Sequence, residues 1–291
     1  MKPLRSLLYV PGHRRDLIEK APRFGADGLI LDLEDAVPAS EKETARRTVA
    51  AAIPELVELG VSPVVRVNDL STGLTPDDIA GVTVAGLAAI RIPKVESPDD
   101  VREVDRLLSA AETAAGLTAG GIELMPAIET AVGYHVAHEV ATASARITVL
   151  SGSALRGGDT QRSIGYRWTP EGLERLYLRS KFLLDCRAAR IRSILMTSWS
   201  EITDLDGLRR DAAFNRQLGY TGMVVIHPSH VPVVNEVFTP DETELAYWRG
   251  LLAAMEQADR QGLAAVTYEG EMVDIAMVKT AREMLSLAGS A

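Results

Sequence analysis

Charged and polar side chains follow several apolar stretches of this 291-residue chain, at the point where each stretch ends. The set consists of Glu34, Asp35, Arg66, Asn68, Lys94, Glu129, Asp159 and His227. If the fold gathers them, several carboxylates share one site, which is costly unless a cation neutralises their charge. Oxygen ligands from only a few side chains suit Mg²⁺, which keeps water and takes further oxygens from a substrate. The sequence contains no Cys/His set with the spacing of a zinc site.

The stretch Ile122–Thr130, IELMPAIET, shows this pattern most clearly. Its apolar run stops at Glu129, and Thr130 opens a segment with helical apolar spacing. This pattern predicts a buried strand that runs into a helix. In parallel α/β architectures, chemistry sits at such strand ends. Taken alone, Glu129 could equally be an acid favoured by the helix dipole, but the same kind of ending recurs elsewhere in the chain.

Eight short apolar stretches alternate with helical patterns along the chain. The expected strands are Ser6–Val10, Gly28–Leu33, Pro63–Val67, Ala88–Ile92, Leu124–Ile128, Ile147–Leu150, Ser193–Thr197 and Met223–Ile226. None alternates polar with apolar residues, which is typical of strands buried on both faces. The repeat predicts an α/β fold, a (β/α)₈ TIM barrel. A doubly wound open sheet is the alternative, which is disfavoured because no Gly-rich dinucleotide fingerprint follows any strand.

Two helical segments close the chain, at about Asp241–Gln261 and Asp274–Leu287, with an irregular piece, VTYEGEMVD, between them. We therefore expect a barrel domain over residues 1–235 and a short C-terminal helical extension over residues 236–291. No linker or low-complexity tract suggests a further domain.

Composition limits the classes of partner. A formal charge of -9 disfavours nucleic acid as the main partner. The single Cys186 excludes an intrachain disulfide, and its expected role is a buried filler on a helix. The apolar run near the N-terminus is too short for a signal peptide, and no stretch has the length of a membrane span. We therefore expect a cytoplasmic protein without a membrane partner.

Several short motifs resemble the citrate lyase β-subunit-like (CitE-like) family. In order they are RSLLYVPG, LDLEDAV, VVRVN, IPKVE, MPAIET, GGD, TPEGLERL, VIHPSHV and EGEMVD, from about Arg5 to about Ala281. The family belongs to the HpcH/HpaI aldolase/citrate lyase superfamily, which has the phosphoenolpyruvate/pyruvate type of barrel and includes malyl-CoA and citramalyl-CoA lyases. Each motif is weak by itself, and their order and spacing support the resemblance.

This resemblance implies a Mg²⁺-dependent carbon–carbon lyase. The substrate would be a 3-hydroxyacyl thioester of the malyl-, citramalyl- or citryl-CoA type, cleaved to acetyl-CoA and a 2-oxo acid. Glu129 and Asp159 would be the Mg²⁺ ligands, and Glu34 and Asp35 would hold metal-bound waters. Arg66 would contact the oxygen that becomes the ketone.

The resemblance also implies how coenzyme A, as part of the substrate, is held. Arg14 and Lys20 would meet its phosphates, and Tyr9 would lie near its adenine. Asp274 matches the family's catalytic acid/base, which acts in the barrel of a neighbouring subunit. A homotrimer or hexamer is therefore expected. Plainer interpretations exist: Lys20 could be ordinary helix surface, and Asp274 could be only a helix N-cap.

The chain departs from the family beside the second metal ligand. Where the family usually has Gly-Ala-Glu-Asp, this chain has Arg156-Gly157-Gly158-Asp159, so Gly158 replaces an acidic residue. This change leaves the acyl group open. It also keeps alive a non-catalytic homologue that binds coenzyme A or a 2-oxo acid. A β subunit of citrate lyase that acts on an acyl carrier protein is a separate alternative, which a weak coenzyme A phosphate cluster and a required partner would favour. A class II aldolase acting on free hydroxy-oxo acids is a further alternative, for which the basic N-terminal residues would be unnecessary.

Overall fold

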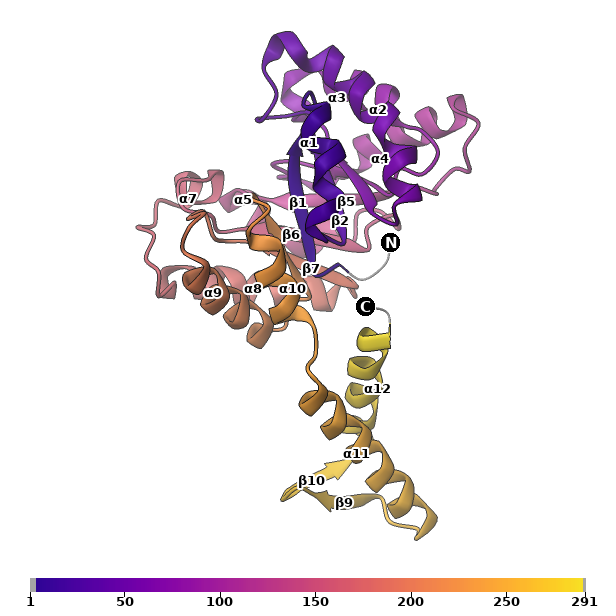
Figure 1. Cartoon of the computed structure of the whole chain (residues 1–291), viewed down its shortest axis with the longest axis vertical. Coiled ribbons are helices and arrows are strands. Elements are labelled where there is room, and N and C mark those ends of the chain that lie inside the picture. The colour runs from indigo at the N-terminus through magenta and orange to yellow at the C-terminus, as the bar shows by residue number, and fades with distance from the viewer. Residues whose placement is uncertain (1–3, 290–291) are drawn as a thin grey trace. The chain divides into compact units, whose positions relative to one another are not determined.

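The structure is a computed structural model that describes residues 4–289. The chain divides into two compact units, Met1–Phe238 and Thr239–Ala291 (Figure 1). The division lies slightly later than the expected boundary after residue 235. The reason is that helix α10 (His230–Phe238) ends with Val234 and Phe238 buried in the large core of the first unit.

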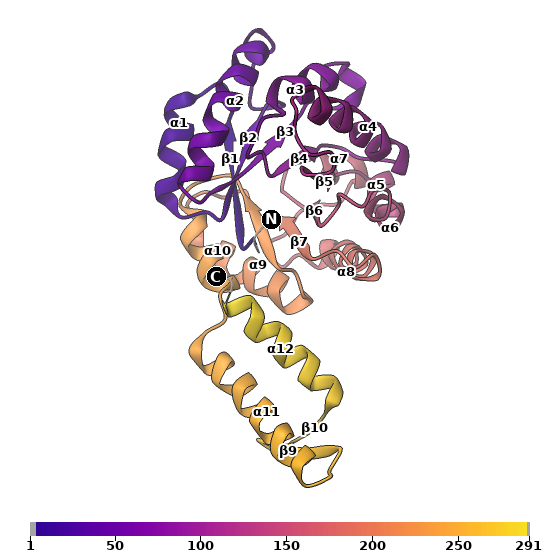
Figure 2. The ribbon, with the colours of Figure 1, turned by 90° about the vertical axis from the view of Figure 1, so that its right-hand side faces the viewer.

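The first unit is a closed barrel of eight parallel strands in sequential order (Figure 2). The strands are β1 (Ser6–Pro11), β2 (Gly28–Asp32), β3 (Ser62–Arg66), β4 (Ala89–Ile92), β5 (Glu123–Ile128), β6 (Val149–Ser153), β7 (Ser193–Thr197) and β8 (Gly222–Val225). Strand β1 pairs with both β2 and β8, which closes the sheet. The predicted (β/α)₈ fold is confirmed, and each expected strand is found close to its predicted position, with ends that differ by a few residues at most.

Helices surround the barrel. They are α1 (Arg15–Lys20), α2 (Lys42–Glu58), α3 (Thr75–Val82), α4 (Pro98–Ala114), α5 (Ala131–His135), α6 (Ala137–Ala141), α7 (Asp159–Ile164), α8 (Leu173–Ala188), α9 (Leu205–Leu218) and α10. Their apolar faces bury the outward side chains of the strands in one large cluster. Cys186 lies in that cluster on α8, as expected.

The inside of the barrel is layered because side chains of a strand alternate between two faces. One side chain from each strand forms a dry inner cluster: Leu7, Ile30, Val64, Ala89, Met125, Val149, Leu195 and Val224. Two residues further along each strand lie Tyr9, Asp32, Arg66, Arg91, Ala127, Ser151, Thr197 and Ile226. We call this second set the polar layer. It faces the carboxyl ends of the strands and forms the base on which the candidate site stands.

The second unit consists of α11 (Glu242–Arg260), β9 (Ala265–Tyr268), β10 (Glu271–Asp274) and α12 (Ile275–Gly289). Its own small core contains Leu251, Met255 and Val273. The expected irregular piece is instead an antiparallel hairpin. Its two turn residues, Glu269 and Gly270, both have positive φ, which matches the right-handed twist of the strands. No helix among residues 4–289 has the length and apolarity that a membrane span requires.

Candidate active site

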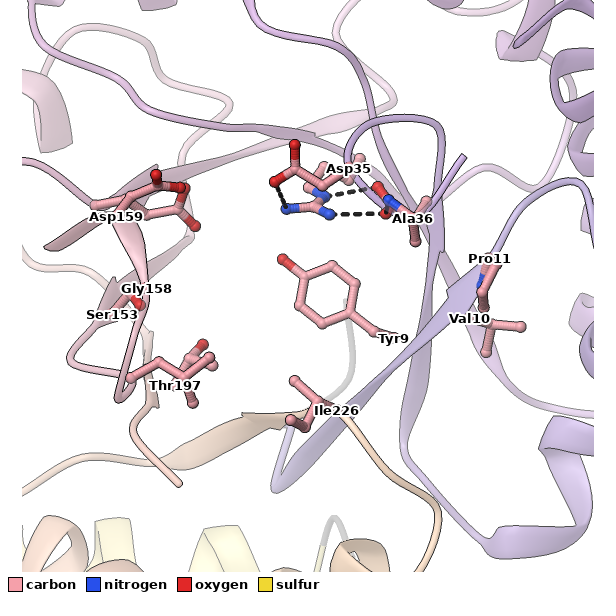
Figure 3. Close-up of a pocket in the computed structure, with 14 residues that line it drawn as sticks. Tyr9, Val10, Pro11, Asp35, Ala36, Ser153, Gly158, Asp159, Thr197 and Ile226 are labelled. Atoms are coloured by element: carbon pink, nitrogen blue, oxygen red, sulfur yellow. Dashed lines mark hydrogen bonds and ion pairs between the residues drawn. The ribbon is translucent and has the colours of Figure 1, made fainter. Parts of the chain in front are cut away.

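A pocket of about 470 Å³ opens at the carboxyl ends of the barrel strands. Its lining consists of Tyr9, Val10, Pro11, Asp32, Asp35, Ala36, Arg66, Glu129, Ser153, Leu155, Gly158, Asp159, Thr197 and Ile226. Figure 3 shows Tyr9 near the centre, with Asp159 on one side and Val10 and Pro11 on the other. The pocket therefore has carboxylates on more than one side of Tyr9, and apolar groups beside those near Val10 and Pro11.

Arg66 is held by two buried carboxylates. Its Nε and Nη2 donate to the two oxygens of Asp32 at 2.6 and 2.7 Å, and its Nη1 lies 2.7 Å from Glu34. Asp32 also accepts from the backbone N–H groups of Glu34 and Ala36, which fixes the loop after β2. Burial opposes ionisation of Asp32, but the Arg66 guanidinium outweighs it and lowers the pKa of Asp32. The position of Arg66 is therefore set before any ligand arrives.

Lys94 joins three of the carboxylates at the mouth. Its Nζ lies 2.6 Å from Glu34 and 3.9 Å from both Asp35 and Asp159. The backbone of Lys94 has φ of +49°, a left-handed conformation that is costly for a residue with a Cβ and that clusters at functional sites. Burial raises the pKa of Glu34, although Arg66 and Lys94 oppose that shift. An ammonium group therefore neutralises part of the acidic cluster.

Arg91 was not singled out from the sequence and lies at the centre of the polar layer. Its Nε donates to Tyr9 Oη at 2.9 Å, its Nη1 donates to Ser151, and its Nη2 lies 3.4 Å from Glu129. The side chain is almost fully buried. The sequence feature that could have identified Arg91 is a charged residue inside an otherwise apolar strand, AIRI. A buried charge needs hydrogen-bonding or charged partners, so such a residue indicates a polar site.

Glu129 and Asp159, the expected metal ligands, line the same pocket. Glu129 follows β5 and is largely buried, whereas Asp159 is the first residue of α7 and pairs with Arg162. Beside it, Gly158 has an ordinary φ of -81°, and a Cβ there would lie 3.3 Å from Leu155 Cβ. A side chain at this position would press on Leu155, which also lines the pocket.

The donor set fits Mg²⁺. Two carboxylates face one polar pocket, and Mg²⁺ is typically bound through one or two carboxylates together with water and substrate oxygens. Within residues 4–289 no group of three or more His, Cys, Asp or Glu side chains is placed to hold a metal ion. Two carboxylates are enough for a metal site that water and substrate oxygens complete.

The structure brings together Tyr9, Glu34, Asp35, Arg66, Glu129 and Asp159. It does not bring Arg14 and Lys20 into this group, since both are exposed, at the two ends of α1, and Arg14 pairs with Asp16 at 2.8 Å. Tyr9 lies inside the barrel, which favours contact with the reacting part of a substrate; its expected place beside the adenine stays a prediction, as do the roles of Arg14 and Lys20.

Asp274 belongs to the second unit, where it ends β10 and accepts a hydrogen bond from the Ala276 N–H at 2.9 Å. This contact satisfies the start of α12, as the N-cap interpretation expects, and its role as an acid/base stays a prediction. His227 Nδ1 accepts a hydrogen bond from the Ser229 backbone N–H at 3.2 Å and lies 2.7 Å from Ser229 Oγ, which is the arrangement of a structural hydrogen-bonding residue.

Known proteins share this sequence and fold. Residues 5–228 match the HpcH/HpaI aldolase/citrate lyase family. The chain is 36% identical to the citrate lyase subunit beta of Leuconostoc mesenteroides over 98% of its length and 93% of that protein. It is 30% identical to the human mitochondrial citramalyl-CoA lyase, covering 99% of this chain and 86% of that protein.

A solved structure of the CitE protein of Mycobacterium tuberculosis, in complex with magnesium, acetoacetate and coenzyme A, superposes with a TM-score of 0.77. The identity is 29%, over 99% of this chain and 98% of that chain. The resemblance inferred from the motifs is confirmed, as is the assignment to carbon–carbon lyases. The chain belongs to the HpcH/HpaI aldolase/citrate lyase family.

Proposed function

We propose that the chain is a Mg²⁺-dependent lyase that cleaves a 3-hydroxyacyl-CoA thioester into acetyl-CoA and a 2-oxo acid. The observation that carries this proposal is one pocket containing two candidate metal ligands, Glu129 and Asp159, and a guanidinium, Arg66, fixed on buried carboxylates. The relatives support it, since one is named as a citramalyl-CoA lyase and another was crystallised with magnesium and coenzyme A.

Glu129 and Asp159 would hold the Mg²⁺ ion, with Glu34 and Asp35 further out. When bound, the ion supplies a Lewis acid that stabilises negative charge on substrate oxygens. In the protein alone, Lys94 pairs with Glu34 and lies near Asp159, and Arg91 pairs with Glu129. If Mg²⁺ were bound, it would take over part of this neutralisation of the carboxylates. The negative charge of the carboxylates is therefore balanced by protein cations when the ion is absent and by the ion and these cations together when it is bound.

The protein's own groups then account for the bond cleavage. The substrate hydroxyl gives its proton to water and its oxygen becomes the carbonyl oxygen of the 2-oxo acid, while the bond between C2 and C3 breaks and its electron pair passes to the thioester as an enolate. Arg66 offers a fixed positive charge to the oxygen that becomes the ketone. The enolate carbon takes up a proton, for which we propose the carboxyl group of Asp274 from a second copy of the chain. A group that arrives from another subunit would also exclude water from the enolate.

An acyl-carrier-protein substrate is the second candidate. It is favoured by the Arg14–Asp16 ion pair, which occupies one of the two expected phosphate-binding cations. Lys20 is the last residue of α1, at the other end of this helix from Arg14. A carrier protein would bring the acyl group on its own pantetheine arm and would rely less on these residues.

The test is cleavage of malyl-, citramalyl- and citryl-CoA, with Mg²⁺ and with excess chelator, monitored by release of the 2-oxo acid. We expect metal-dependent release from at least one thioester. Asp274→Ala should abolish it, whereas Asp259→Ala, which removes an exposed carboxylate of the same unit, should not. Release that persists in chelator or in Asp274→Ala would contradict the corresponding assignment.

A complementation experiment tests the origin of Asp274. Glu129→Gln and Asp274→Ala should each be inactive when expressed alone. If Asp274 acts in the barrel of another copy, co-expression should produce mixed oligomers in which some sites have both residues, and activity should return. Two inactive variants that stay inactive in proven mixed oligomers would show that both residues must belong to one chain.

A further inference from the structure

A spare hydrogen-bond donor lies in the base of the pocket, on Tyr9. Arg91 Nε donates to Tyr9 Oη at 2.9 Å, so the tyrosine oxygen is the acceptor in that contact. A phenol also has one proton to donate. Among residues 4–289 the structure gives that proton no acceptor, and Figure 3 shows the hydroxyl directed toward the side of the pocket that contains Asp159.

The cation next to Tyr9 is largely engaged by the protein. The Arg66 guanidinium lies 4.7 Å from the centroid of the Tyr9 ring, and three of its five N–H groups are engaged by Asp32 and Glu34, one on each nitrogen. A ligand oxygen that reaches this part of the polar layer can therefore accept from the remaining N–H groups of Arg66 and from the Tyr9 hydroxyl. Burial raises the pKa of Tyr9, so the hydroxyl keeps its proton at neutral pH.

We propose that Tyr9 is a substrate-contacting residue, which donates a hydrogen bond to an oxygen of the 2-oxo acid part of the bound substrate. Arg91 is its positioning residue, because the Nε contact fixes both the ring and the direction of the free proton. No proton is transferred in this step. The inference rests on the proposed function only for the identity of the ligand as a 2-oxo acid.

The competing role for Tyr9 is support of Arg91 alone. Ser151 offers a matched control, since its hydroxyl is a second partner of the same guanidinium and the residue is fully buried below the pocket lining. Tyr9→Phe and Ser151→Ala each remove one hydrogen bond from Arg91. Only Tyr9→Phe removes a donor that faces the pocket.

Binding of pyruvate and of glyoxylate to the full-length protein would be measured by calorimetry in the presence of Mg²⁺. We expect Tyr9→Phe to weaken binding about tenfold, the effect of one good hydrogen bond. Ser151→Ala should stay within about threefold of wild type on the same scale. With an active thioester, the same pattern should appear in kcat/KM, and thermal melting would verify that both variants are folded.

Equal losses in the two variants would overturn the proposal, because Tyr9 would then act only through Arg91. Unchanged binding in Tyr9→Phe would overturn it as well, as would a wild-type protein that binds neither 2-oxo acid. A wild-type protein that binds these acids but cleaves no thioester would refute the proposed lyase function. The comparison between Tyr9→Phe and Ser151→Ala would still decide the role of Tyr9.

Discussion

Replacing Asp32 by asparagine tests whether the buried Asp32–Arg66 pair organises the site. Asp32 is 1% exposed and Arg66 12% exposed at their side chains, so solvent screens the pair little. Asparagine keeps the shape but loses the charge, and its NH₂ group cannot accept the contacts that one carboxylate oxygen now accepts. The variant leaves the buried Arg66 guanidinium with Glu34 at 2.7 Å and the exposed Asp35 at 3.9 Å.

The expected cost is about 3–5 kcal/mol of the free energy of unfolding, the usual effect of breaking a buried ion pair by removing one partner. Urea unfolding at neutral pH would measure it. Activity of the folded variant should also fall, because Arg66 loses one of the two hydrogen bonds that set its orientation. Arg102→Gln is a matched control, since the Arg102–Asp99 pair is exposed on α4 and should contribute at most about 1 kcal/mol.

The pH dependence gives a second measurement of the same pair. The pKa of Asp32 is lower in the folded state than in the unfolded chain, mainly because Arg66 outweighs the effect of burial. Its stabilisation is therefore present above the unfolded pKa of about 3.9 and is lost as the pH falls through the folded value. Asp32→Asn should lack this part of the acid-induced loss of stability. A cost below about 1 kcal/mol, or an unchanged acid limb, would refute the reasoning.

Two further predictions concern the same pocket. Thr197 is a buried residue whose Oγ1 has no hydrogen-bond partner among residues 4–289, so Thr197→Val should raise the free energy of unfolding by about 1 kcal/mol. Thr75→Val removes a hydroxyl that donates to the Asn68 carbonyl and should lower the free energy of unfolding. Urea unfolding would measure both changes, and a destabilised Thr197→Val would contradict the assignment. Glu129→Gln should weaken Mg²⁺ binding at least about tenfold in calorimetry, and unchanged affinity would remove Glu129 from the ligand set.

The alternation of eight apolar stretches with helical patterns was enough to predict the barrel, because short runs without polar alternation are typical of parallel strands covered by helices. The ends of β2, β3 and β5 could also be predicted from the sequence, because Asp32, Arg66 and Glu129 interrupt or end apolar runs. The hairpin of the second unit was missed because its first turn residue, Glu269, carries none of the usual preference for positive φ. Only the pairing of the flanking strands reveals it.

The polar layer shows why contacts inside the site could not be predicted. Tyr9 and Arg91 are 82 positions apart in the sequence, and nothing local indicates that one donates to the other. Their meeting depends on the closure of the barrel and on the two-residue period that turns both side chains inward at the same height. Once that register is fixed, each inward residue that follows the dry inner cluster must face either a partner or the pocket. Each guanidinium nitrogen of Arg91 has a partner, whereas Tyr9 has one for its oxygen but, among residues 4–289, none for its proton. The proposed role of Tyr9 in ligand contact therefore depends on the strand register and on which donors and acceptors have partners. Both are properties of the folded structure that the linear sequence does not contain.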